Sequence, residues 1–108
     1  MGVLRFRPKS EGPLCEAIRQ RRRLALDYGE GERTVEPYIH GLDRHGQAVL
    51  RAYQLAGPSK LGHTNRWRLF QLSRATDLRI LDQTFSGERE DFNSQDPDIA
   101  HVHCQIGG

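Results

Sequence analysis

The sequence predicts a mainly β fold, a small β-barrel with one N-terminal α-helix. Three observations lead to this prediction: short segments alternate apolar and polar residues, turn-forming residues separate them at close spacing, and a single segment near the start has helical spacing. A chain of 108 residues is long enough for one domain with one small core. We therefore expect a flexible arm over residues 1–12 and a single domain over residues 13–108.

The predicted helix runs from Pro13 to Arg22. Leu14, Ala17 and Ile18 recur at the spacing of one helical face, and Pro13 suits the first helical turn because its missing N–H would have no partner there. The chain then enters a predicted β-hairpin over residues 24–38. Leu24, Leu26 and Tyr28 alternate with polar or small residues, and glycines at 29 and 31 mark the turn.

The second hairpin strand begins at Arg33, and Pro37 belongs at a strand end, a bulge or an edge because it lacks a ladder donor. Residues 39–46 predict a turn between strands, with DRHG at 43–46 as its tip. Residues 47–55 predict a central strand, and residues 56–65 a loop rich in turn formers. Residues 67–72 predict a further strand, followed by a one-turn break at 73–76.

Residues 77–85 fit a strand or a helix, and their β-rich surroundings favour the strand. Residues 86–97 are acidic and predict an irregular loop anchored by Phe92. Residues 99–106 close the chain as a last strand, in which Val102, Cys104 and Ile106 share one face.

The two cysteines, Cys15 and Cys104, could pair. The start of the chain is too short and too charged for a secretory signal, however, and no run of 18 apolar residues is present. A cytoplasmic protein without a membrane segment is therefore expected, and in that compartment two small free thiols are the expectation for Cys15 and Cys104.

Charge is unevenly distributed. Residues 1–81 contain 15 Lys and Arg against eight Asp and Glu, whereas residues 82–108 contain Arg89 alone against six acids. Either the basic body binds polyanions, or the acidic tail folds back across it.

The order of these segments resembles the WYL domain family. The resemblance rests on a basic helix ending in Arg22 and Arg23, on Arg-Thr-Val-Glu-Pro-Tyr at 33–38, and on Trp-Arg-Leu-Phe at 67–70 followed by Leu72 and Arg74. It covers roughly residues 14–85, and the segment 33–38 is its most specific part. The counterpart of the family's Trp-Tyr-Leu triplet is Ala48, Val49 and Leu50.

The resemblance implies an Sm-like, SH3-type β-barrel that senses anionic or nucleic-acid ligands. WYL domains usually follow a winged helix-turn-helix in bacterial transcription regulators, for which residues 1–12 leave no room, so a free-standing and diverged member is expected. Guanidinium groups suit phosphate recognition, and aromatic rings beside them can stack on bases. We expect a ligand site made of Arg51, Tyr53, Arg66, Trp67, Arg68 and Arg74, and an auxiliary basic patch made of Arg19, Arg21, Arg22 and Arg23.

The expected function is that of a non-enzymatic sensor or accessory module, without a cofactor, that binds single-stranded nucleic acid or a nucleotide. In the alternative reading the arginines are solvated or paired with Glu16, Asp27, Glu36 and Asp77, and the aromatic residues belong to the core. The protein would then be an interaction module whose sheet edges pair to form a dimer or a ring. His101, His103 and Cys104 do not predict a metal site, since Cys104 points to the opposite strand face.

Overall fold

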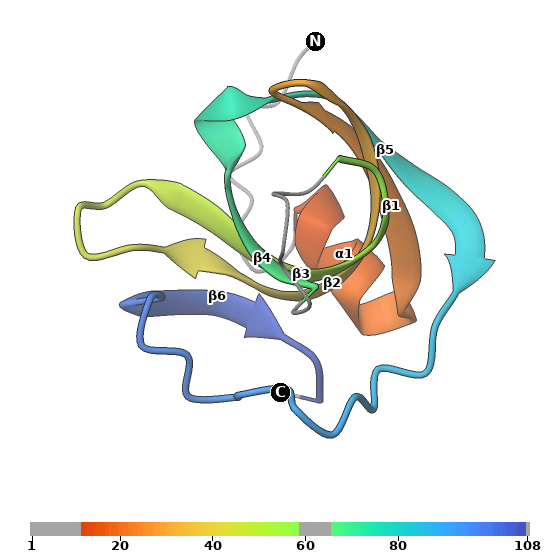
Figure 1. Ribbon diagram of the computed structural model, residues 1–108. Coiled ribbons are helices and arrows are strands. Elements are labelled where there is room, and N and C mark those ends of the chain that lie inside the picture. The colour runs from red at the N-terminus through yellow and green to blue at the C-terminus, as the bar shows by residue number, and fades with distance from the viewer. Residues whose placement is uncertain (1–11, 59–65, 108) are drawn as a thin grey trace, which may run out of the picture.

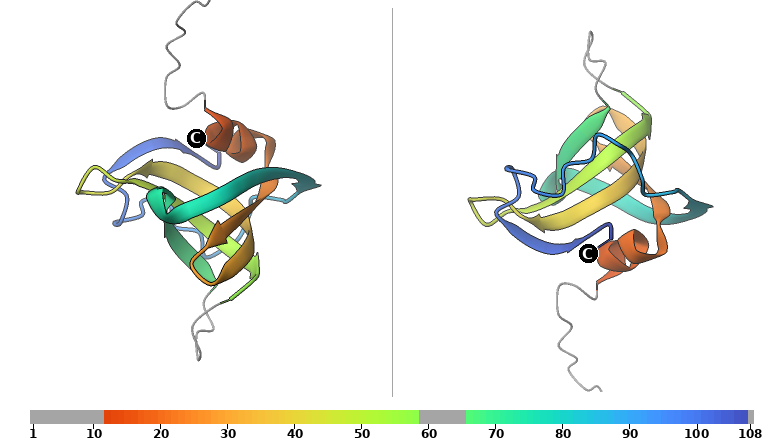
Figure 2. Two further views of the ribbon diagram at one scale, coloured as in Figure 1. Left: turned by 90° about the horizontal axis from the view of Figure 1, so that it is seen from above. Right: turned by 90° about the horizontal axis from the view of Figure 1, so that it is seen from below.

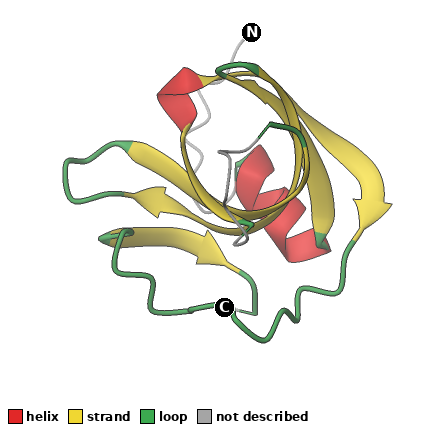
Figure 3. Cartoon of the chain, viewed as in Figure 1, coloured by secondary structure: helices red, strands yellow, loops and turns green. Residues whose placement is uncertain are grey.

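The computed structural model describes residues 12–58 and 66–107 and shows a mainly β chain with one α-helix (Figures 1 and 3). Its elements are α1 (Pro13–Gln20), β1 (Arg22–Tyr28), β2 (Gly31–Leu42), β3 (Ala48–Ala56), β4 (Trp67–Gln71), the 3-10 helix η2 (Leu72–Arg74), β5 (Ala75–Thr84) and β6 (His101–Gln105). The predicted N-terminal arm lies outside the described residues except for Gly12, which is the N-cap of α1.

Helix α1 begins at Pro13 as predicted and ends where Arg21 adopts a left-handed conformation with a φ of 54°. Cys15, Ala17 and Ile18 are buried, whereas Leu14 is only half-buried. This sharp end lets the chain pass directly into β1, so the helix lies close to the sheet that follows it.

The predicted hairpin is confirmed as β1 and β2, which pair antiparallel from Leu24 with Val35 to Tyr28 with Gly31. Gly29, with a φ of 63°, makes the tight turn possible. Pro37 lies at a register shift between β2 and β3. On its other side, β2 pairs with β1 up to Val35 and with β6 from Ile39 onward, so the missing donor of Pro37 falls where β2 changes partner.

The described strands pair in the order β4-β3-β2-β1-β5, and β6 pairs with the second half of β2. The sheet curls strongly (Figure 1), but no pairing among the described residues joins β4 to β5, so closure into a barrel is not confirmed. At this opening the backbone N–H of Gln71 donates to the hydroxyl of Tyr28 at 3.2 Å. The three residues of η2 then carry the chain from β4 to β5.

Residues 75–84 form a strand, β5, which confirms the strand reading of this ambiguous segment. The predicted last strand is confirmed as β6. Gly41 allows β6 to approach β2 closely, because a Cβ atom at this position would lie 2.1 Å from the carbonyl oxygen of His101. Residues 85–100, between β5 and β6, form no strand and are anchored by the buried side chains of Phe85 and Ile99.

Two apolar clusters lie on the two faces of the curled sheet. The inner cluster joins α1 to the concave face and contains Ala17, Ile18, Leu24, Leu26, Val35, Leu50, Ala52 and Phe70. The outer cluster contains Tyr38, Ile39, Val49, Phe85 and Ile99, with Tyr53, Trp67 and Phe92 packed against it. Strand β3 contributes to both clusters, as a central strand should. Helix α1 lies at one end of the curled sheet and the β1–β2 turn at the other (Figure 2).

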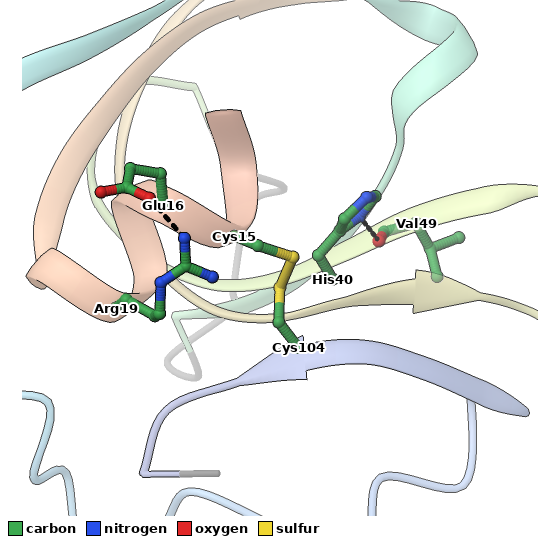
Figure 4. Close-up of a disulfide and its surroundings, with 6 residues drawn as sticks. All are labelled: Cys15, Glu16, Arg19, His40, Val49 and Cys104. Carbon is green, nitrogen blue, oxygen red and sulfur yellow. Dashed lines mark hydrogen bonds and ion pairs between the residues drawn. A yellow bond between two sulfur atoms is a disulfide. The ribbon is translucent and has the colours of Figure 1, made fainter. Parts of the chain in front are cut away.

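Cys15 of α1 and Cys104 of β6 form a disulfide, with their Cα atoms 5.7 Å apart (Figure 4). The expectation of two free thiols is therefore wrong. The alternation of β6 turns Cys104 toward the inner cluster, where Cys15 is fully buried on the facing side of α1. The two residues are separated by 89 positions, and nothing local in the sequence indicates that they meet. No helix in the described part of the chain has the length and apolar character needed to cross a membrane.

Candidate anion-binding sites

Arg51, the first residue expected to bind phosphate, is held by the acidic residues that follow β5. Its Nε and Nη2 atoms donate to the two carboxylate oxygens of Asp96, and Nη2 also donates to Asp98 at 2.8 Å. Only 17% of the Arg51 side chain and 6% of the Asp96 side chain are exposed. The tail thus folds back across this part of the basic body, which is one of the two arrangements that the charge distribution predicts.

The pKa of Asp96 reflects this contact. Burial raises the pKa, but hydrogen bonds from the Arg51 side chain and the Asp98 backbone, together with the charge of Arg51, leave it below its usual value. Asp96 is consequently an ionised partner of Arg51 at neutral pH.

Tyr53 and Trp67 lie on the same outer face as Arg51 and are directly opposite each other in the β3–β4 register. Their rings form an edge-to-face pair with centroids 5.3 Å apart. The guanidinium carbon of Arg89 lies 3.4 Å from the centroid of the Tyr53 ring, and the ring of Phe92 lies 5.9 Å from that of Trp67. An open pocket of about 230 Å³ remains beside Trp67, Phe92 and Arg51.

Arg66 and Arg68 lie apart from Arg51, and Arg68 shares the inner face of β4 with Phe70. The structure adds Arg33, which the sequence analysis did not include among the ligand residues. Arg33 pairs with Leu26 in the β1–β2 register, and its guanidinium carbon lies 5.5 Å from the ring centroid of Tyr28 and 6.0 Å from that of Phe70. We call Arg33, Arg66 and Arg68 the inner arginine cluster.

Hydrogen bonds to neutral groups position these guanidinium groups. Arg33 donates to the side-chain oxygen of Gln54 at 3.4 Å and to the carbonyl of Tyr28 at 3.2 Å. Arg66 donates to the carbonyls of Gln54 and Leu55 at 3.4 and 3.3 Å. Gln54 is itself 1% exposed, and its amide donates to the carbonyls of Gly57 and Pro58, so it is a fixed support rather than a mobile acceptor.

The inner arginine cluster concentrates positive charge. Burial lowers the pKa of Arg68, and the neighbouring charges of Arg33 and Arg66 lower it further. Within residues 12–58 and 66–107, no carboxylate forms an ion pair with Arg33 or Arg66. The Nε atom of Arg33 is buried and has no hydrogen-bond partner among the same residues. Among the described residues, an anion entering this end of the sheet would meet several donors, and neither Arg33 nor Arg66 would have to be released from a carboxylate first.

The structure thus divides the six predicted ligand residues. Arg51, Tyr53 and Trp67 share the outer face, Arg66 and Arg68 belong to the inner arginine cluster, and Arg74 is exposed on η2.

Each arginine of the predicted auxiliary patch contacts another group of the protein. Arg19 pairs with Glu16, Arg21 donates to the carbonyl of Ser86, Arg22 contacts Asp82 at 3.1 Å, and Arg23 contacts Glu36 at 3.8 Å. These contacts agree with the reading in which the basic residues are paired within the protein.

Arg33 could have been found from the hairpin alone. A two-residue turn at 29–30 places Tyr28 opposite Gly31 and therefore Leu26 opposite Arg33. Because Leu26 belongs to the core, its partner must point to the same inner face. By contrast, the acidic partners of Arg51 come from a loop that has no periodic pattern.

The described residues contain no group of three or more His, Cys, Asp or Glu side chains arranged to hold a metal ion. The rings of His101 and His103 lie 5.3 Å apart, while Cys104 is committed to the disulfide. Comparison with models of protein families, with curated proteins and with solved structures finds no match for this chain.

Proposed function

We propose that this protein is a non-enzymatic sensor or accessory module that binds an anionic ligand, single-stranded nucleic acid or a nucleotide, at the inner arginine cluster. The observation that carries this proposal is the gathering of Arg33, Arg66 and Arg68 at one end of the sheet, where Arg33 and Arg66 have no carboxylate partner among the described residues. Arg33 is half-buried and Arg66 is exposed, so both are within reach of a ligand. Guanidinium groups that converge in this way suit the recognition of phosphate.

We further propose that the chain is a diverged member of the WYL domain family with an Sm-like, SH3-type β-barrel fold. The helix, the hairpin, the segment 33–38 and the strand 67–71 occur in the order that characterises WYL domains, and the strongly curled sheet suits an Sm-like, SH3-type barrel. Arg33 is the first residue of the most family-specific segment, so the proposed ligand site and the proposed family rest partly on the same residues.

The experiment is fluorescence polarisation with labelled oligothymidylate at several salt concentrations between about 50 and 200 mM. Three phosphate contacts predict a slope of about −2 in a plot of log K against log salt for a single strand. Arg33→Gln combined with Arg66→Gln should reduce binding by about tenfold or more, since each removes a charge-assisted contact. Arg44→Gln combined with Arg79→Gln is the matched control, because both residues are exposed and belong neither to the cluster nor to the expected ligand site.

Absence of binding at low salt would contradict the proposal. An equal loss in the two double variants would also contradict it, because binding would then depend on net charge rather than on the inner arginine cluster.

A further inference from the structure

The outer face of β3 and β4 has the composition of a second nucleic-acid surface. Arg51 and Tyr53 are two residues apart on one face of β3, and Trp67 stands opposite Tyr53 on β4. A cation beside two aromatic rings is the combination with which proteins bind single strands, the cation contacting phosphate and the rings stacking on bases.

Residues 86–98, which we call the acidic loop, occupy this face with matching chemistry. Asp96 binds Arg51 through both carboxylate oxygens, and Asp98 adds a second carboxylate, as phosphate groups would. The ring of Phe92 packs on Trp67 in a tilted arrangement, with centroids 5.9 Å apart and an interplanar angle of 32°, and covers the surface on which a base could stack. Arg89, from the same loop, covers Tyr53. The acidic loop thus presents two negative groups and a tilted aromatic ring to the residues that would receive a nucleotide.

A limited set of contacts holds the acidic loop on this face. Besides the pairs with Arg51, Arg89 donates to the buried carboxylate of Glu36 at 2.8 Å, and the ring of Phe92 lies 4.8 Å from that of Tyr38. It forms no strand, and the buried residues Phe85 and Ile99 anchor its two flanks. Several of its own hydrogen bonds are local, such as those from Gln95 to Asn93 and from Asp98 to Asp96. The side chain of Asp98 is 61% exposed although it pairs with Arg51. Segments without strand pairing open at a lower cost than global unfolding. When Arg89 leaves, Arg23, which lies 3.8 Å from Glu36, remains as a cationic partner of that carboxylate.

We propose that the acidic loop is an internal competitor for a second single-stranded nucleic-acid site formed by Arg51, Tyr53 and Trp67. Binding at this site displaces the carboxylates of Asp96 and Asp98 from Arg51 and the ring of Phe92 from Trp67. The inference extends the proposed function, from which it takes its ligand class, to a surface that is separate from the inner arginine cluster. The affinity of the second site is set by the competition with the acidic loop.

The test compares two double variants of the full chain that carry the same change of charge in the same loop. Asp96→Asn with Asp98→Asn removes both partners of Arg51. Glu88→Gln with Glu90→Gln changes two exposed acids that form no ion pair among the described residues. With labelled oligothymidylate at low salt, the affinity of the Asp96/Asp98 variant should be about tenfold higher than that of the wild type. The affinity of the Glu88/Glu90 variant should rise by less than about threefold. Trp67 is the only tryptophan, so stacking on it should quench the intrinsic fluorescence of the first variant.

Two further sets of variants keep the outcome decisive. Introducing Arg33→Gln and Arg66→Gln should weaken wild-type binding through the first site by about tenfold or more and leave the gain in the Asp96/Asp98 variant intact. If the wild type binds through Arg33 and Arg66 but the gain is absent, the competitor is refuted and the proposed function stands. If only the Asp96/Asp98 variant binds, the proposed function fails and the second site stands. If the Asp96/Asp98 variant loses the circular dichroism signal of the folded protein, the single variant Asp98→Asn takes its place in the binding measurement. An affinity of Asp98→Asn equal to that of the wild type then overturns the inference.

Discussion

The environment of Arg51 shows why charge patterning alone does not identify a binding residue. Arg51 is expected in the ligand site, and its nearest contacts are Asp96 and Asp98, which lie 45 and 47 positions away. Arg33 lies in a recognisable hairpin but is excluded from the expected site, although register alone places it beside the core. A residue's neighbours along a hairpin can be predicted, whereas partners supplied by an irregular loop cannot, because no periodicity fixes their position.

Replacing Arg51 with Gln should lower the free energy of unfolding by about 2 kcal/mol, because the nearly buried carboxylate of Asp96 loses its charged partner. Urea denaturation at neutral pH measures the change. Arg79→Gln is the control: Arg79 pairs with Glu32 and Asp77 on an exposed surface, so no measurable change is expected. Equal effects of the two substitutions would show that the Arg51 contact has no special role in stability.

The same contact predicts a pH dependence. The pKa of Asp96 is lower in the folded protein than in an unfolded chain, so the unfolded state binds a proton first as the pH falls. The contribution of Asp96 is therefore fully present above its ordinary pKa and is lost as the pH falls through the folded value. The stability difference between wild type and Arg51→Gln should be large at pH 7 and should shrink in strong acid. A difference that is constant with pH would argue against an ionised Asp96.

Among the elements, β1, β3, β4 and β6 lie close to their predicted positions because alternation and turn residues act locally. Strand β2 begins near its predicted start but continues to Leu42, so the expectation of a turn over residues 39–42 is wrong. Pairing with β3 and β6 extends the strand there. The choice of strand for residues 75–84 depends instead on pairing with β1, which local periodicity did not decide. The disulfide between α1 and β6 is a tertiary feature of the same kind. It depends on the packing of a helix from the start of the chain against a strand from its end.

Because the disulfide closes a loop across 89 positions, replacing Cys104 with Ser should destabilise the protein by about 3 kcal/mol. The loss arises mainly because the unfolded chain regains the freedom that the cross-link removes. Urea denaturation with and without reductant measures it, and Cys15→Ser should reproduce the effect. Reductant should change neither variant further. If reduction leaves the wild type equally stable, the bond is not formed in solution.

At the scale of the whole molecule, the uneven charge of the sequence acquires a structural meaning. Residues 82–108 supply Asp82, Asp96 and Asp98 as partners for arginines of residues 1–81. Part of the opposite excess charge of the two segments is therefore compensated internally. Arg33 and Arg66 form no ion pair among the described residues. Folding back of the tail thus applies to the outer face of the sheet, whereas binding of polyanions at the inner arginine cluster is a proposal. The linear sequence could not assign the two readings to separate faces.

The edges of the sheet bear on the alternative function, assembly into a dimer or ring. Among the described strands, β4 and β6 have only five residues each, and β5 has register shifts against β1 and carries the ion pairs of Arg79. Short, irregular and charged edges disfavour pairing between copies. We therefore expect a monomer, and light scattering should give a mass of 12.4 kDa that does not change with protein concentration. A stable dimer or ring that ignores oligonucleotides would instead favour the interaction module over the anion-binding function.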